Sequence, residues 1–176
     1  MKISAQELAH ITGGVLSGET SLTVTGIMTD SRSSGAGHDV LFIALRGPNH
    51  DGHRFIEALY HRGVRLFLAD TVPKDSAAMT GAGFVTVDDT LEALHKLAKW
   101  RRESFGGKVI AVTGSAGKTV VKEWCTHVPQ PLIRSPKSYN SQVGVALSLM
   151  NIDDRYEAAV IELNSKPGRW KSWHVL

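Results

Sequence analysis

The chain of 176 residues has a single cysteine, Cys125, and no apolar run long enough to cross a membrane. One cysteine excludes an internal disulfide and fits a reducing compartment. A membrane-spanning helix needs about 20 consecutive apolar residues, and the opening residues MKISAQE do not begin the apolar segment of a signal peptide. We therefore expect a cytoplasmic protein without membrane insertion.

The chain also has little net charge, since 20 Lys and Arg oppose 17 Asp and Glu, which leaves +3. The charge is uneven, because His95 to Lys137 contains only two acidic residues and nine basic ones, at positions 96, 99, 101, 102, 108, 118, 122, 134 and 137. This excess favours an anionic small ligand, although a solvated helix face explains several of these residues equally well. Nucleic acid is a weaker candidate, because no platform of aromatic residues interleaves with the cations.

Short apolar runs alternate with helical patterns, which is typical of an α/β fold built from parallel strands. Ser4 and Glu7 have the spacing of a helix-capping box, and Gly13 follows as a stop signal. Apolar runs predict buried strands at residues 41–45, 64–69, 84–87, 108–112 and 158–162. Helices are predicted at residues 5–12, 55–60 and 91–98 and after residue 118.

The stretch Ser104 to Gly107 is the best domain boundary, because two glycines precede the apolar strand that follows. We predict a small N-terminal α/β domain at residues 1–105 and the beginning of a parallel-sheet domain at residues 106–176. Only two convincing strands follow Gly107, so we expect the second domain to be incomplete. Such a sheet would expose an edge and an apolar face, which favours aggregation or lack of order after about Gly107.

The most informative segment is residues 108–119, which read KVIAVTGSAGKT. An apolar strand leads into a glycine-bracketed turn and then into Lys-Thr at the start of a helix. The full phosphate-loop pattern has a glycine at the position of Val112, so this is a shorter form. A structural glycine turn is the alternative, but the flanking strand and helix favour a nucleotide-triphosphate site.

Each residue type in this loop suits a triphosphate and its metal ion. Backbone N–H groups of a small-residue loop surround a phosphate without side-chain obstruction, and the helix dipole favours the same anion. Lys118 supplies a cation for the transferring phosphate, and Thr119 supplies a hydroxyl ligand for Mg²⁺. The predicted nucleotide-binding residues of the loop are Gly114, Ser115, Ala116, Gly117, Lys118 and Thr119.

Other polar positions lie next to predicted elements. Glu162 ends an apolar strand, where a carboxylate is suited to Mg²⁺ or to its water, although a solvated strand end is the alternative. A polar loop at residues 138–144 leads into an apolar helix. In the first domain, residues 29–32 and 46–55 are dense in polar residues and glycine, so they are candidates for ligand loops or for simple turns. His50 and His53 do not have the spacing of a metal site by themselves.

Five motifs stand in one order along the chain: Asp30-Ser31-Arg32, Gly47-x-x-x-Asp51-Gly52-x-x-Phe55, the phosphate loop, Asn140-x-x-x-Gly144 and Glu162. In this order they resemble the Mur ligases, and most closely the members that add D-alanyl-D-alanine to a UDP-linked muramoyl tripeptide. The stretch 134–144 is similar to the version fused to an alanine racemase. The resemblance covers about residues 1–168.

The resemblance implies a cytoplasmic ATP- and Mg²⁺-dependent amide ligase of peptidoglycan synthesis, and so a part in cell-wall biogenesis, cell shape and cell division. ATP phosphorylates the terminal carboxylate of UDP-N-acetylmuramoyl tripeptide, and the amine of D-alanyl-D-alanine then displaces phosphate. By the same resemblance the substrate-binding residues are Ser31, Arg32, Asp51 and Gly52. Lys118 is the catalytic residue, Thr119 and Glu162 hold Mg²⁺, and Asn140 contacts nucleotide or substrate.

The family's remaining ATPase segments and its C-terminal domain have no counterpart in these residues, so we expect this chain to be inactive alone. A non-catalytic module that binds the UDP-sugar is the first alternative. A Mur-type ligase that adds a different amino acid is the second, and an unrelated phosphate-loop kinase or GTPase is the least favoured. The sequence does not indicate an oligomeric state.

Overall fold

The computed structural model describes residues 2–33, 35–47, 50–127, 132–135 and 141–163. The chain divides into two compact units, Met1–Lys96 and Leu97–Leu176. The division falls inside helix α3 (Thr90–Ser104), whereas the sequence places a boundary at residues 105 and 106. The domain limits 1–105 and 106–176 therefore stay a prediction.

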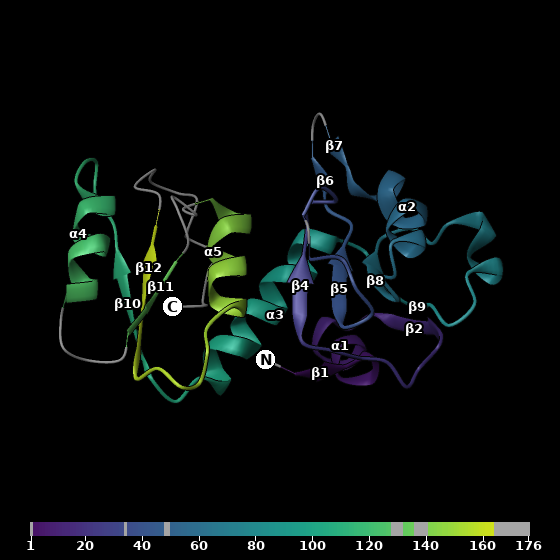
Figure 1. The fold of residues 1–176 in the computed structure, drawn as a ribbon, viewed down its shortest axis with the longest axis horizontal. Helices are drawn as coiled ribbons and strands as arrows, with labels where there is room; N and C mark the ends of the chain where they lie inside the picture. The colour runs from purple at the N-terminus through teal and green to yellow at the C-terminus, as the bar shows by residue number, and fades with distance from the viewer. Residues whose placement is uncertain (1, 34, 48–49, 128–131, 136–140, 164–176) are drawn as a thin grey trace. The chain divides into compact units, whose positions relative to one another are not determined.

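The first unit is built around a five-stranded sheet with the order β2-β9-β8-β5-β4 (Figure 1). The contacts between β4, β5, β8 and β9 are parallel, while β2 pairs with β9 in the antiparallel sense. The strands are β2 (Val15–Gly18), β4 (Gly26–Met28), β5 (Val40–Ile43), β8 (Leu66–Ala69) and β9 (Gly83–Thr86). The parallel arrangement agrees with the α/β prediction, and the antiparallel β2 was not foreseen.

Two short pairs complete the strands of this unit. β1 (Ile3–Ser4) pairs with β3 (Thr23–Val24), and β6 (Arg46–Gly47) pairs with β7 (His50–Asp51), both antiparallel. The second pair carries His50 and Asp51, which belong to one of the two polar stretches that the sequence marks as candidate ligand loops.

Capping residues account for the ends of helices in the first unit. Ser4 caps α1 (Ala5–Thr12) with the predicted capping box, and Gly13 closes it at φ 74°. α2 (Ile56–His61) follows the short 3₁₀ helix η1 (Gly52–Phe55), and a second such helix, η2, covers Lys74–Ala78. The Asp89 carboxylate accepts hydrogen bonds from the first backbone N–H groups of α3, at Leu91 and Glu92.

Aromatic side chains from three adjacent strands form the centre of the first unit's core. Phe67 stacks on Phe84 with ring centroids 5.3 Å apart, and Phe42 meets Phe67 edge-on at 6.5 Å. Ile56 and Leu59 of α2 are fully buried against the same cluster. This core holds the carboxyl ends of β4, β5 and β8 in fixed positions, from which the polar loops start.

The second unit is a three-stranded parallel sheet with the order β10-β12-β11. Figure 1 shows its two longer helices, α4 and α5, on opposite sides of this sheet. The elements are β10 (Lys108–Val112), α4 (Lys118–Trp124), the 3₁₀ helix η3 (Cys125–His127), β11 (Leu132–Arg134), α5 (Gln142–Met150) and β12 (Ala158–Glu162). Strand β11 was not predicted from the sequence.

Strand β10 lies at an edge of this sheet among the described residues. Ile110 of β10 is 44% exposed, and α4 exposes Val120, Val121 and Trp124. The predicted open edge and apolar face are therefore present. The described residues after Gly107 nevertheless form regular strands and helices, so the expected lack of order is wrong for them, and aggregation stays a prediction. No described helix is long and apolar enough to span a membrane.

Candidate functional site

The phosphate loop joins β10 to α4, in the strand-turn-helix order that the sequence predicts. Gly114 (φ 150°) and Gly117 (φ 76°) have backbone angles that other residues rarely adopt. Gly117 is the N-cap of α4, so the loop's N–H groups and the helix begin together. Ser115, Ala116 and Gly117 are exposed, which leaves the loop open to an anion.

Lys118 is the first residue of α4, and its ammonium donates to the carbonyl oxygen of Gly114. The side chain therefore lies along the loop, where a cation serves the phosphates that the loop's N–H groups surround.

Thr119 and Glu162, the two predicted ligands of one metal ion, are in direct contact. Thr119 Oγ1 donates a hydrogen bond to Glu162 Oε2 over 3.1 Å. The parallel register explains the contact, because Val112, the last residue of β10, stands opposite Glu162, the last residue of β12. Both strands thus deliver their carboxyl ends to the start of α4.

The oxygen donors of this pair fit Mg²⁺. The ion prefers octahedral oxygen ligands at about 2.0–2.1 Å, so neighbouring ligand oxygens lie about 2.9 Å apart, close to the observed separation. Among the described residues no group of three or more His, Cys, Asp or Glu side chains is placed to hold a metal. Two protein ligands suffice, because Mg²⁺ in phosphate-loop sites takes its other oxygens from phosphate and water. Asn140, the remaining predicted nucleotide contact, lies outside the described residues.

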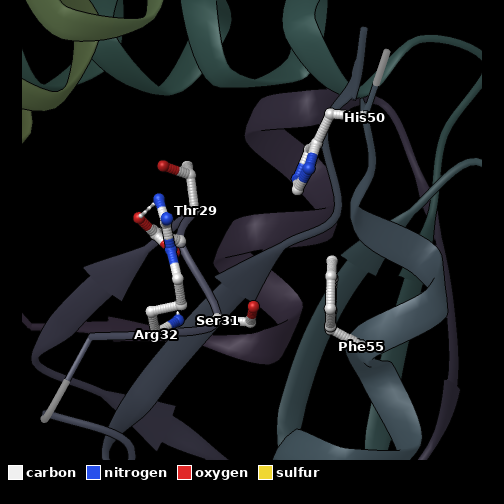
Figure 2. A pocket seen from close by; sticks show the side chains of 6 residues that line it. Thr29, Ser31, Arg32, His50 and Phe55 are labelled. Atoms are coloured by element: carbon white, nitrogen blue, oxygen red, sulfur yellow. Dashed lines mark hydrogen bonds and ion pairs between the residues drawn. The ribbon is translucent and has the colours of Figure 1, made fainter.

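A second site is a pocket of about 470 Å³ in the first unit, lined by Thr29, Asp30, Ser31, Arg32, His50 and Phe55. Figure 2 shows Thr29, Ser31 and Arg32 on one side and His50 and Phe55 on the other. The two rings stack with centroids 5.7 Å apart. The structure therefore brings together the two polar loops that the sequence marks as ligand candidates.

Arg32 and Asp30, which both line this pocket, form a bidentate ion pair. Arg32 Nε donates to Asp30 Oδ1 over 3.0 Å, and Nη2 donates to Oδ2 over 2.8 Å. The hydrogen bonds from the Arg32 side chain and from its backbone N–H lower the pKa of Asp30 to about 2. The carboxylate is therefore charged at neutral pH, and it sets the direction of the guanidinium of a side chain that is 88% exposed.

Asp51 and Gly52, the other predicted substrate residues, do not line this pocket. The Asp51 carboxylate caps η1 by accepting from the backbone N–H of His53 over 3.0 Å. Gly52 is buried, and a Cβ there would lie 2.9 Å from the backbone of Leu45. Both residues thus shape the loop between β7 and α2, and their direct contact with substrate stays a prediction.

His53 links this loop to the neighbouring strand, a connection that the sequence did not indicate. Its Nε2 accepts from the backbone N–H of Asp70 over 3.1 Å, so Nδ1 carries the hydrogen and donates to Asp51 Oδ1 over 2.7 Å. Arg46 adds an ion pair of 3.0 Å to Asp70. The hairpin that carries His50 is thereby fixed to the end of β8. The bonds that hold Asp51 also lower the pKa of its carboxyl, with the His53 side chain as the main cause.

A family model described as "Mur ligase family, catalytic domain" matches residues 23–102. The matched residues include the pocket of the first unit and end before the phosphate loop. They contain Asp30, Arg32 and Asp51 of the motifs on which the resemblance was based.

Known ligases match nearly the whole chain. The UDP-N-acetylmuramoyl-tripeptide–D-alanyl-D-alanine ligase of Haemophilus influenzae is 33% identical over 172 residues, which are 94% of this chain and 36% of that protein. The solved UDP-N-acetylmuramoylalanyl-D-glutamyl-2,6-diaminopimelate–D-alanyl-D-alanyl ligase of Acinetobacter baumannii is 28% identical with a TM-score of 0.84, over 96% of this chain and 38% of that one. A MurF ligase of Thermotoga maritima, solved in complex with ADP, has a TM-score of 0.69 at 28% identity, over 83% of this chain and 34% of that one.

The chain thus spans little more than a third of the length of these relatives. Their match continues through both units, in agreement with the α/β prediction and with a partial second domain. The resemblance stated from the motifs is confirmed: the Mur ligase family model matches part of the chain, and nearly the whole chain is similar to ligases named for the addition of D-alanyl-D-alanine.

Proposed function

We propose that this chain carries the UDP-substrate site and part of the ATP site of a ligase that joins D-alanyl-D-alanine to UDP-N-acetylmuramoyl tripeptide. The observation that carries the proposal is the contact of Thr119 with Glu162 beside an open glycine loop, in a chain whose first unit has a separate polar pocket. The named relatives support the same choice of substrates. We place the reaction in the cytoplasm, where it would supply cell-wall precursor to growing and dividing cells.

The chemistry requires two steps. The terminal carboxylate of the tripeptide attacks the γ-phosphorus of ATP, so that an acyl phosphate forms and ADP leaves. The amine of D-alanyl-D-alanine then attacks the acyl carbon, phosphate leaves, and the nitrogen loses a proton to give the amide. Mg²⁺, held by Thr119 and Glu162, would supply charge neutralisation at the phosphates.

The residues of the chain have distinct tasks in this scheme. The N–H groups of residues 114–117 bind phosphate oxygens, and Lys118 stabilises the charge that moves from the γ-phosphate to ADP. In the first unit, Arg32 and Ser31 present donors to the nucleotide part of the muramoyl substrate, and the His50–Phe55 stack offers an aromatic surface. The relatives extend beyond the residues that they share with this chain, so ligand binding and turnover are measured separately.

Calorimetric titration of the chain with UDP-N-acetylmuramoyl tripeptide and, separately, with ATP and Mg²⁺ tests the proposal. Binding of both ligands supports it. Binding of the UDP-sugar without ATP favours the non-catalytic module, and ligation at ordinary rates by this chain alone would contradict the expected inactivity. A panel of amino acids and dipeptides offered to the full-length ligase separates D-alanyl-D-alanine from a different incoming group.

A further inference from the structure

Helix α4 buries a lysine and exposes its apolar side chains. Lys122 is 0% exposed, whereas Val120, Val121 and Trp124 are 52%, 47% and 71% exposed. Burial of apolar area alone would favour the opposite orientation. Polar contacts therefore help to set the rotation of the helix, and Lys122, in its last turn, is one of the residues that make them.

The contact of Lys122 is with the predicted metal ligand. Its Nζ lies 3.4 Å from Glu162 Oε2, and the two side chains are 0% and 2% exposed. This is the same oxygen that accepts the hydrogen bond of Thr119. Thr119 and Lys122 are three positions apart and so share one face of α4, which directs both toward the end of β12.

We propose that Lys122 is a positioning residue that gives this site its selectivity for metal ions. With Lys122 in place, the site binds a divalent cation that is complexed with a nucleotide polyphosphate in preference to the bare cation. The inference rests on the proposed ATP site. Lys122 orients the Glu162 carboxylate toward Thr119 and balances its charge, and it does so without contact to the nucleotide.

The selection follows from the charges at the site. Glu162 carries −1, while Lys122 and Lys118 each carry +1, so the three groups together carry +1. A bare dication that approaches Glu162 Oε2 also approaches the Lys122 ammonium, and like charges repel strongly where water is excluded. A complex of Mg²⁺ with ATP is an anion, which the same positive site attracts.

If the ion pair of Lys122 with Glu162 were merely structural, the variants would behave differently. Removal of Lys122 would then lower stability, but it would not change the affinity for a bare cation relative to the affinity for its nucleotide complex. The ratio of the two affinities therefore distinguishes a selecting residue from a structural one.

The test compares the 176-residue chain with its Lys122→Met, Lys122→Gln and Lys122→Arg variants, after circular dichroism has shown which of them fold. Bare Mn²⁺ binding is measured by electron paramagnetic resonance, and a fluorescent ATP analogue is titrated with Mg²⁺ present. We expect at least tenfold tighter Mn²⁺ binding and about tenfold weaker nucleotide binding in whichever neutral variant folds. Lys122→Arg keeps the charge and should resemble the unchanged chain.

An unchanged ratio of the two affinities in a folded neutral variant overturns the proposal. A ratio that changes as much in Lys122→Arg as in the neutral variants also overturns it, because the arginine keeps the charge. Glu162→Gln added to the neutral variant should abolish the gain in Mn²⁺ binding, which identifies Glu162 as the ligand concerned. Failure of the unchanged chain to bind the nucleotide counts against the proposed ATP site. In that case unchanged Mn²⁺ binding by a folded neutral variant still overturns the proposal, because Lys122 would then not repel the bare cation.

Discussion

Thr119 and Glu162 are 43 positions apart in the sequence and are joined by a hydrogen bond of 3.1 Å between Oγ1 and Oε2. The contact exists because β10 and β12 are parallel neighbours that end at the same level. A hydroxyl and a carboxylate at this separation form a small oxygen site beside the phosphate loop.

Glu162→Gln should remove the Mg²⁺-dependent part of ATP affinity. The amide keeps a hydrogen-bond acceptor for Thr119 but loses the charge that Mg²⁺ requires. We expect ATP affinity to fall about tenfold or more with Mg²⁺ present and to change little in EDTA, as measured by calorimetry. Glu157→Gln replaces an exposed carboxylate just before β12 and is the control. Equal losses with and without Mg²⁺ would show that Glu162 does not hold the metal.

His53→Ala should weaken binding of the UDP-substrate, although His53 does not line the pocket. The change removes the imidazole that joins Asp51 to Asp70 and so loosens the hairpin that carries His50. We expect a loss of stability of about 1–3 kcal/mol and a several-fold loss of UDP-ligand affinity. Denaturant unfolding and calorimetry measure the two effects. His61→Ala, on the exposed side of α2, should leave both unchanged.

Arg101→Ala should destabilise the second unit. Arg101 is 3% exposed, and its Nη2 donates to the Ile152 carbonyl and to Asp154 Oδ1, each over 2.7 Å. Its removal leaves a buried carbonyl without this donor, so we expect a loss of about 2–3 kcal/mol in urea unfolding. Asp154→Asn is the comparison, because Asp154 is 67% exposed and its loss should cost less. A larger loss of unfolding free energy in Asp154→Asn than in Arg101→Ala would contradict this ranking of the two residues.

Stability should fall as the pH is lowered from about 7 to 5, in part because of His95. Burial lowers the pKa of His95 below its ordinary value of 6.5, against the opposing effect of Asp89 and Glu92. At His95 the unfolded chain therefore binds a proton more readily than the folded chain over this range. The folded state loses stability until the pH passes below the pKa that His95 has in the folded chain. His95→Gln should flatten this part of the curve of unfolding free energy against pH. An unchanged slope in the variant would exclude His95 as a cause.

Much of the fold could be predicted from local patterns. The capping box of Ser4 and Glu7, the apolar strands and the glycine loop are each specified by neighbouring residues, and the structure contains them. Strand β2 was missed because Val15 is 72% exposed and the segment has no apolar run. Strand β11 was missed because its three residues, Leu132–Arg134, are too short for a periodic signal.

The candidate site was predicted only in part. The glycines, Lys118, Thr119 and Glu162 carry recognisable chemistry at recognisable places in the sequence. Lys122 was counted with the other basic residues, because its burial depends on the rotation of α4 and on a strand end 40 residues away. His53 was considered only as a metal ligand, and its link between the Asp51 carboxylate and the Asp70 backbone depends on how β8 lies beside the hairpin. Such contacts arise from tertiary packing and leave no local pattern.

The central claim is that one chain binds two different nucleotides at two separate sites. Its most direct test is a calorimetric titration of the unchanged chain, Arg32→Ala and Lys118→Ala with UDP-N-acetylmuramoyl tripeptide and with ATP and Mg²⁺. Arg54→Ala and Lys108→Ala serve as exposed controls. We predict that Arg32→Ala lowers only the affinity for the UDP-substrate and Lys118→Ala only the affinity for ATP, each about tenfold or more. Equal losses of both ligands in either variant would contradict the account.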